Sequence, residues 1–267
     1  MVRIATTLGL SANGLQELAA KYSKTCLAIV KLNVTNVASI KKAAEEVAML
    51  LPDGLDYLIN NAGISPRPMT SFEDMCDPLY RVFICSMLML HQSSDLKLLA
   101  DELSFNTITV IQVISLFLPL MKKSAVKKII FITSVLGSLE LGGSWPFISN
   151  SYSISKAALN ISASRSTVRS TDTFSDVSIQ QARSKVVTVA VVHPGWVQTD
   201  LAMTSGGGWG GYAKKFPQMT TAHSSAGVVA VAKKVTIDST ASFYNYDGSK
   251  LLFLVRLTCT LIQDNDM

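Results

Sequence analysis

Short apolar runs alternate with amphipathic stretches along most of the chain. The runs are rich in β-branched residues and predict strands, whereas the stretches between them repeat apolar residues every three or four positions, as packed helices do. In "SIKKAAEEVAMLL", Ile40, Ala44, Val47 and Leu51 fall on one helical face. The predicted strands are Val2–Thr7, Cys26–Leu32, Leu55–Gly63, Lys127–Ser134, Lys185–Trp196 and a last short strand in "ASFYNYDG".

This alternation predicts an α/β fold with a doubly wound, Rossmann-like parallel sheet. The 267 residues are enough for one large domain, and we expect a single domain over residues 1–250 followed by an atypical tail over 251–267. Hydrophobic residues make up 48% of the chain and charged residues 16%, compared with about 25% charged in a typical soluble domain. That composition suits a sheet that is buried on both faces.

Polar residues and glycines gather where the predicted strands end. Asn60–Gly63, Ser134 and the pair Pro194-Gly195 each follow a strand. Since ligands of doubly wound sheets bind outside the carboxyl ends of the strands, these residues predict a small-molecule site at that edge.

Charge and cysteine usage exclude several other classes. The net charge is only +5, and the basic residues are scattered, so we expect a solvated surface and no nucleic-acid partner. The four cysteines and three histidines lack metal-ligand spacing, so we expect no metal and read the cysteines as buried or semi-buried thiols in a reducing compartment.

No segment strongly predicts a membrane span. The longest apolar run, Thr107–Met121, is short and interrupted, and no signal-peptide pattern opens the chain. We therefore expect a soluble, cytoplasmic protein without a membrane partner. A membrane-associated protein that uses the apolar stretches 75–90 and 251–262 is the less favoured alternative.

Five motifs occur in a fixed order along the chain. They are "NNAG" (Asn60–Gly63), Asn106, "ITS" ending at Ser134, "YSISK" (Tyr152–Lys156) and "HPGWVQTD" (His193–Asp200). With them the sequence resembles the short-chain dehydrogenase/reductase family, and most of all its carbonyl-reductase-like members, over roughly residues 2–248. The resemblance implies interconversion of a carbonyl compound and an alcohol with NAD(P), NADP being slightly preferred. The position near Leu8 that often selects NADP carries neither a basic nor an acidic residue.

The resemblance also implies a catalytic set of Ser134, Tyr152, Lys156 and Asn106. Tyr152 would act as general acid and base, and Lys156 lies one helical turn away, so its ammonium should lower the phenol's pKa from about 10. Ser134 would bind the substrate oxygen, and Asn106 would connect the lysine to a water-mediated proton relay. Ser138 is the rival of Ser134, which we prefer because it directly follows the strand. Alone, the tyrosine and lysine would be read as a surface pair.

Cofactor contacts follow from the same resemblance. Asn33 would contact adenine, Gly63 would let the backbone approach the cofactor, and Thr199 would bond the carboxamide or a phosphate. Asn60 could instead cap a turn, and Asn106 could be an ordinary polar residue near a helix start. The residues implied are Asn33, Asn60, Ala62, Gly63, Tyr152, Lys156, Pro194, Gly195, Val197 and Thr199.

The glycine-rich turn TGxxxGxG, which would approach the pyrophosphate, is missing from the sequence. Gly9 and Gly14 have a different spacing, and Asn33 lies only 24 residues after Gly9, about half of what three strands and two helices need. We therefore expect Val2–Thr7 to be the second strand of the fold, so that the chain begins one βα unit late. Without the central first strand, either the sheet closes up around the gap or the fold is marginal.

Three stretches depart from the family pattern: the long segment between Asn61 and Asn106, residues 164–178, and the tail. One hypothesis is an imperfect gene model; the other is a divergent enzyme whose insertions form a lid. The alternative to an enzyme is a non-catalytic remnant without stable dinucleotide binding. We expect a small carbonyl or alcohol as partner, and a monomer or a homodimer paired through the helices of Asn106 and Tyr152.

Overall fold

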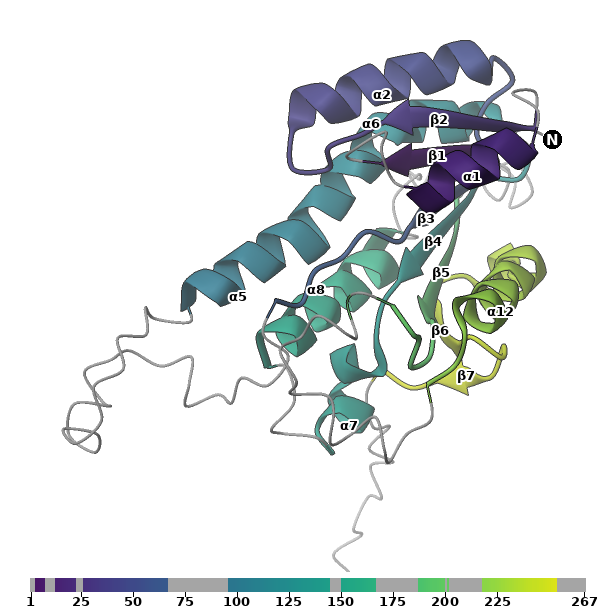
Figure 1. The fold of residues 1–267 in the computed structure, drawn as a ribbon. Helices are drawn as coiled ribbons and strands as arrows, with labels where there is room; N and C mark the ends of the chain where they lie inside the picture. The colour runs from purple at the N-terminus through teal and green to yellow at the C-terminus, as the bar shows by residue number, and fades with distance from the viewer. Residues whose placement is uncertain are drawn as a thin grey trace, which may run out of the picture.

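Parallel strands flanked by helices on both faces form the core of the chain (Figure 1). This computed structural model describes residues 3–7, 13–22, 26–66, 96–144, 150–166, 187–199, 201 and 218–253. The strands are β1 (Arg3–Thr7), β2 (Leu27–Lys31), β3 (Tyr57–Asn60), β4 (Lys128–Ile132), β5 (Thr188–His193), β6 (Ser242–Asn245) and β7 (Lys250–Leu251). The helices are α1 (Asn13–Lys21), α2 (Val37–Leu50), α5 (Leu96–Leu103), α6 (Thr109–Lys123), α7 (Leu139–Gly142), α8 (Asn150–Ser166) and α12 (Thr221–Lys234).

The main sheet has five strands in the order β3-β4-β5-β6-β7, and all but β7 are parallel. Side chains alternate between its two faces, as strand geometry requires. Phe131 and Val191 pack with residues of α6 and α8, whereas Ile130 and Val192 pack with residues of α12. The near-continuous apolar sequences of β4 and β5 therefore reflect burial on both sides, and the predicted α/β class is confirmed.

Strands β1 and β2 form a separate parallel pair. Among the described residues no strand hydrogen-bonds to both β1 and β3, so the sheet does not close up around this position. Of the two outcomes expected for a missing central strand, the first is therefore wrong. In the described part of the chain, the ladder hydrogen bonds of β1 and β2 join these two strands to each other and to no other strand.

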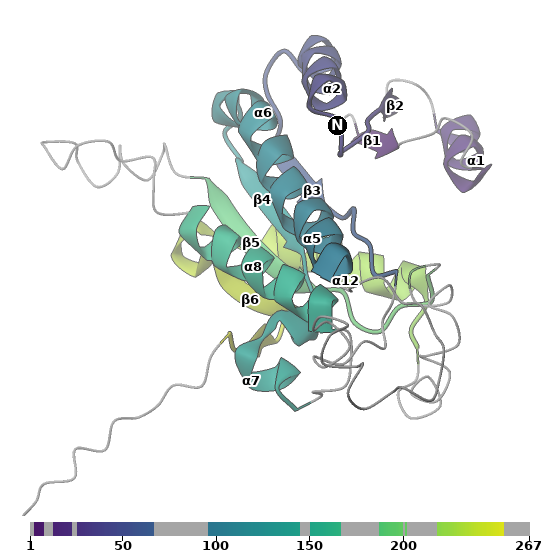
Figure 2. The same cartoon turned by 90° about the vertical axis from the view of Figure 1, so that its left-hand side faces the viewer.

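Helices α2 and α6 connect this pair to the rest of the molecule. Val30 of β2 and Ile40 of α2 share a buried apolar cluster with Phe117 and Leu120 of α6, and Leu58 of β3 packs against it. Figure 2 shows α2 next to α6, with the β1–β2 pair beyond it. Side-chain packing thus takes the place of backbone hydrogen bonds at this junction.

A single continuous helix of 28 residues, Leu96–Lys123, contains α5, a π-helical turn (Ser104–Ile108) and α6. Within the described residues it is the one helix long and apolar enough to cross a bilayer, and 39% of its apolar window is buried. Phe117 and Met121 of this helix pack in the core clusters. Stretch 75–90 lies outside the described residues.

The predicted tail starts inside the sheet. Leu251 pairs with Phe243 in the β6–β7 ladder, and the ring of Phe253 stacks on that of Phe243 at 5.2 Å between centroids. Residues 251–253 therefore pack with the domain that we predicted to end at 250, and residues 254–267 lie outside the described part.

The apolar cluster at this junction predicts different losses of unfolding free energy for two alanine substitutions on α6. Replacing the buried Phe117 with alanine should lower the free energy of unfolding by about 3–5 kcal/mol, because it leaves a cavity between α6, α2 and β2. Ile111→Ala on the same helix is the control, since Ile111 is 44% exposed, and should change stability by about 0.5 kcal/mol or less. Denaturant unfolding measures both free energies. Equal losses in the two variants would show that the cluster around Phe117 does not stabilise the packing of β1 and β2 on the rest of the molecule.

Candidate active site

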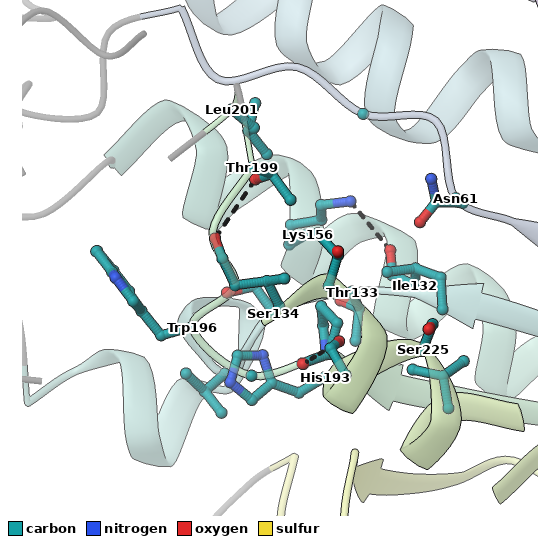
Figure 3. A pocket seen from close by; sticks show the side chains of 18 of the residues that line it. Asn61, Ile132, Thr133, Ser134, Lys156, His193, Trp196, Thr199, Leu201 and Ser225 are labelled. Carbon is teal, nitrogen blue, oxygen red and sulfur yellow. Dashed lines mark hydrogen bonds between the residues drawn. The ribbon is translucent and has the colours of Figure 1, made fainter. Parts of the chain in front are cut away.

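A cavity of about 820 Å³ opens at the carboxyl ends of β3, β4 and β5 (Figure 3). Its walls come from the segments that follow these three strands, from α8, and from the N-terminal part of α12. The strand ends thus bring together residues that are far apart in sequence, at the edge where the sequence predicts a site. The polar lining residues are Asn61, Ser65, Thr133, Ser134, Tyr152, Lys156, His193, Thr199, Thr221, Ser224 and Ser225.

Ser134 lies at the end of β4 and faces the cavity, as the sequence predicts. Its backbone is extended, and its hydroxyl accepts a hydrogen bond from the Leu136 amide at 3.2 Å, which caps a short 3₁₀ turn. Ser138 makes different contacts, because its hydroxyl accepts from the Leu141 amide and donates to the Leu252 carbonyl at 2.7 Å. Since Ser138 does not line the cavity, the geometry favours Ser134 of the two.

The turn after β4 is fixed against α8 by buried polar contacts. Thr133 Oγ1 donates to Asn160 Oδ1 at 2.6 Å, and Asn160 Nδ2 donates to the Gly137 carbonyl at 3.0 Å. A Cβ atom at Gly137 would lie 2.7 Å from the Lys156 carbonyl carbon, closer than packed atoms can come. Glycine is therefore required where this turn meets α8.

Lys156 projects from α8 into the cavity and is 3% exposed. Its Nζ donates to the Ile132 carbonyl at the end of β4 at 3.1 Å (Figure 3). The same atom lies 5.5 Å from the centroid of the Tyr152 ring. Burial lowers the pKa of the ammonium to about 8, and the charge of Glu102 partly opposes this. Lysine and tyrosine therefore share the cavity, as their spacing predicts.

The pKa of Tyr152 moves in the direction opposite to our expectation. We expected the Lys156 ammonium to lower it. Instead, burial raises the pKa of the phenol, because it disfavours the phenolate, and the negative charge of Glu102 raises it further. In this structure Tyr152 is held as a protonated phenol.

Asn106 sits in the π-helical turn, where it is fully buried. Its Oδ1 accepts from the Ile64 amide at 2.8 Å, and its Nδ2 donates to the Ile64 carbonyl and to Ser155 Oγ at 2.9 and 3.0 Å. The side chain therefore joins the segment after β3 to α8. A Cβ at Gly63 would come within 3.4 Å of Lys156 Nζ, so this join brings the backbone of Gly63 beside the lysine.

The segment after β5 closes the cavity from the other side. Gly195 has φ = +84°, in the left-handed region that favours glycine, and a Cβ there would meet Met219. Ser224 of α12 donates to the Pro194 carbonyl at 2.7 Å, and Val197 forms a β-bridge with Met219. Residues 193–197 of the "HPGWVQTD" motif thus line the site, and the Pro194 carbonyl joins them to α12.

The structure brings most of the sequence-derived site residues together. Those that line the cavity are Ala62, Gly63, Ser134, Tyr152, Lys156, Pro194, Gly195, Val197 and Thr199. Asn33 does not: its Oδ1 accepts from the amide and hydroxyl of Thr35, at 3.0 and 2.7 Å, in a local turn. Asn60 and Asn106 are buried behind the lining, and Asn60 Nδ2 has no hydrogen-bond partner among the described residues.

Two titratable residues near the site were not predicted as site residues from the sequence. His193 lines the cavity, and burial lowers its pKa to about 4, so the imidazole is neutral near pH 7. Glu102 is buried behind Tyr152 and Lys156 and acts on the charge of both. The sequence does carry a signal for Glu102, which is an acidic residue one helical turn before Asn106 in a largely apolar helix.

The residues present fit one half of a nicotinamide dinucleotide. Gly63, Lys156, Pro194, Gly195 and Thr199 surround a cavity in which the backbone lies open to a flat ring and a ribose. No glycine-rich turn for a pyrophosphate occurs among the lining residues of the described part of the chain. The same part contains no group of three or more His, Cys, Asp or Glu that could hold a metal, and Cys26 is exposed rather than buried.

Comparison with known proteins points to one family. The family profile described as "short chain dehydrogenase" matches residues 2–207. An uncharacterised oxidoreductase of Schizosaccharomyces pombe is 27% identical, over 84% of this chain and 77% of that protein. NADPH-bound carbonyl reductase from chicken fatty liver superposes with a TM-score of 0.68 at 28% identity, covering 93% of this chain and 86% of the other. The carbonyl reductase Sniffer of D. melanogaster matches in fold, with a TM-score of 0.68, 24% identity, and coverage of 93% and 87%.

Asn106→Asp tests the join between the π-helical turn and α8. The aspartate loses both Nδ2 donors and places a negative oxygen near the Ile64 carbonyl, so we expect a loss of about 2 kcal/mol or more in unfolding free energy at pH 8. This environment raises the pKa of the new carboxyl in the folded state. The loss of stability in the variant should thus be smallest below about pH 4, which is the pKa of an aspartate in the unfolded chain, and should grow as the pH rises.

Denaturant unfolding at pH 5 and pH 8 measures this penalty. Asn36→Asp is the matched control, because Asn36 is an exposed N-cap of α2, where aspartate caps equally well. A penalty that does not grow with pH would show that the Asn106 amide donors are not required.

Proposed function

The chain belongs to the short-chain dehydrogenase family, and from this premise we propose that it interconverts a carbonyl compound and an alcohol with NAD(P), NADP being slightly preferred. The observation that carries the proposal is the cavity in which Ser134, Tyr152 and Lys156 meet at the carboxyl ends of parallel strands. Family membership alone would not support chemistry, because a fold can persist without its activity.

Tyr152 is the proton donor in this proposal. The phenol is protonated near neutral pH, so the side chain can give its proton to a carbonyl oxygen that gains negative charge during reduction. Ser134, which lines the cavity after β4, would donate a hydrogen bond from its Oγ to the same oxygen. Together they stabilise the charge that develops as the carbonyl becomes an alcohol.

Lys156 supports the tyrosine and one end of the cofactor. Its ammonium is oriented by the Ile132 carbonyl and lies beside Gly63, where it would hold the hydroxyls of the nicotinamide ribose. When bound, the reduced nicotinamide supplies the hydride for the carbonyl carbon. The positive charge of Lys156 also favours return of negative charge to Tyr152 after it has donated its proton.

One observation favours a second candidate, a non-catalytic remnant that does not hold the dinucleotide stably. The sequence contains no TGxxxGxG turn, and the described lining residues supply no substitute for it. Support for the enzyme comes from the chicken carbonyl reductase, which was solved with NADPH bound and shares 28% identity. Binding of NADPH or NADH, measured by fluorescence or thermal shift, separates the two candidates.

The substrate that we propose is a small, apolar carbonyl compound or alcohol. Ile59, Ile132, Leu201 and Val228 line the cavity beside its polar groups, which favours an apolar body around one polar oxygen. We propose further that the protein works in the cytoplasm as a monomer or homodimer, without a nucleic-acid or membrane partner.

Tyr152→Phe tests the role of the phenol. The change removes one oxygen, so kcat for carbonyl reduction should fall by at least about 10²-fold while cofactor affinity stays nearly unchanged. Tyr22→Phe serves as the control, because Tyr22 is 45% exposed on the surface near α1. Turnover that survives in Tyr152→Phe would assign the proton to another donor, and failure of the wild type to bind millimolar cofactor would favour the remnant.

The pH dependence of kcat/KM provides a further prediction. Lys156 is charged below its pKa of about 8 and neutral above it, so kcat/KM for reduction should fall as pH rises through about 8. A steady-state profile from pH 6 to pH 10, with saturating cofactor kept constant, measures it. A profile that stays flat to pH 10 would contradict the role of the lysine charge.

A further inference from the structure

Glu102 is a buried acid that the proposed chemistry does not use. The residue is fully buried in α5, and neither carboxylate oxygen has a hydrogen-bond partner among the described residues. Ser151, at the start of α8, is equally buried, and its hydroxyl is also without a partner there. An unpaired buried carboxylate costs stability, so its presence beside the site requires an explanation.

The contact between the two helices places these groups opposite each other. Asn106 Nδ2 donates to Ser155 Oγ, and Thr107 Oγ1 donates to the Ser155 carbonyl at 2.9 Å. One turn earlier on both helices, the register brings Glu102 against Ser151. The hydroxyl is near enough to lower the pKa of the Glu102 carboxyl, although the two groups do not reach hydrogen-bonding geometry in this conformation.

Among the described residues, the charged group that acts on Glu102 comes from α8. From α8, Lys156 lowers the pKa of the Glu102 carboxyl, and Glu102 in turn raises the pKa values of Lys156 and Tyr152. On its own helix, Asp101 pairs with Lys97 at 2.7 Å, and both side chains are more than half exposed to solvent. Glu102 is thus an inward acid whose charge acts on the catalytic pair.

We propose that Glu102 is a positioning residue for the reaction proposed above, on which this inference rests: its buried carboxylate stabilises the ammonium of Lys156 and the protonated phenol of Tyr152. The site is thereby biased toward a charged lysine beside a neutral tyrosine, the state that donates a proton to a carbonyl. Alcohol oxidation needs the phenolate instead, so the same carboxylate disfavours oxidation near pH 7.

Burial raises the pKa of Glu102 to about 7, so the carboxyl changes charge within the working range of the site. Above that value the carboxylate is present and opposes loss of the Lys156 proton. Its removal should let both Lys156 and Tyr152 deprotonate at lower pH, and both effects shift the alkaline limit of reduction in the same direction.

The first test needs neither cofactor nor activity. Titration of the side-chain carboxyls by ¹³C NMR, with Glu102 assigned from its absence in Glu102→Gln, should show a midpoint near 7, well above the value of about 4.3 for exposed glutamates. Lys156→Met should raise that midpoint further, and Lys156→Gln serves if the first variant does not fold. A midpoint near 4, or one that both lysine variants leave unchanged, overturns the inference.

The second test uses the reaction. In Glu102→Gln, which keeps the shape of the side chain, the alkaline limb of kcat/KM for carbonyl reduction should move to lower pH than in the wild type. Asp101→Asn removes the neighbouring, exposed carboxylate and should leave the profile in place. An unshifted limb in Glu102→Gln sinks the inference, whereas a wild type without turnover or cofactor binding sinks the proposed function and leaves the NMR result to decide the coupling.

Discussion

The site depends on how closely helix α8 can approach its neighbours. A glycine at position 137 lets the turn after β4 touch the backbone of Lys156, and Asn106 ties the segment after β3 to Ser155 on the same helix. The first is a close steric approach, and the second consists of hydrogen bonds, which fix a direction as well as a distance. Ser134, Gly63 and the lysine meet in one cavity because both neighbouring segments are fixed to one helix.

The close packing around α8 also determines the pKa values of the ionisable side chains in the site. Removing water from α8 disfavours both the phenolate of Tyr152 and the ammonium of Lys156. The buried charge of Glu102 opposes the effect on the lysine and adds to the effect on the tyrosine. Desolvation is the largest cause of the shift in all three residues. A charge in such a place acts on its neighbours without the screening that solvent gives to exposed pairs such as Lys97–Asp101.

Much of the fold is readable from the sequence because parallel strands buried on both faces leave continuous apolar runs, as in β4 and β5. The strand ends then locate Ser134 and the residues after Asn60, since topology fixes where carboxyl ends meet. Burial of individual groups was not readable. The direction of the Tyr152 pKa shift and the presence of Glu102 depend on packing between α5 and α8, and Asn33 uses its side chain in a turn that its motif does not reveal.

The split sheet has a mechanical consequence. Within the described residues, a displacement at the end of β4 passes directly to β3 and β5 through ladder hydrogen bonds, which are stiff and directional. Among the described residues, no ladder hydrogen bond carries the same displacement to β1 and β2, which pack on the rest of the molecule through apolar side chains of α2 and α6. A shift where a substrate binds would therefore reach β1 and β2 through side-chain packing, which has no preferred direction, whereas it would reach β3 and β5 through directional hydrogen bonds.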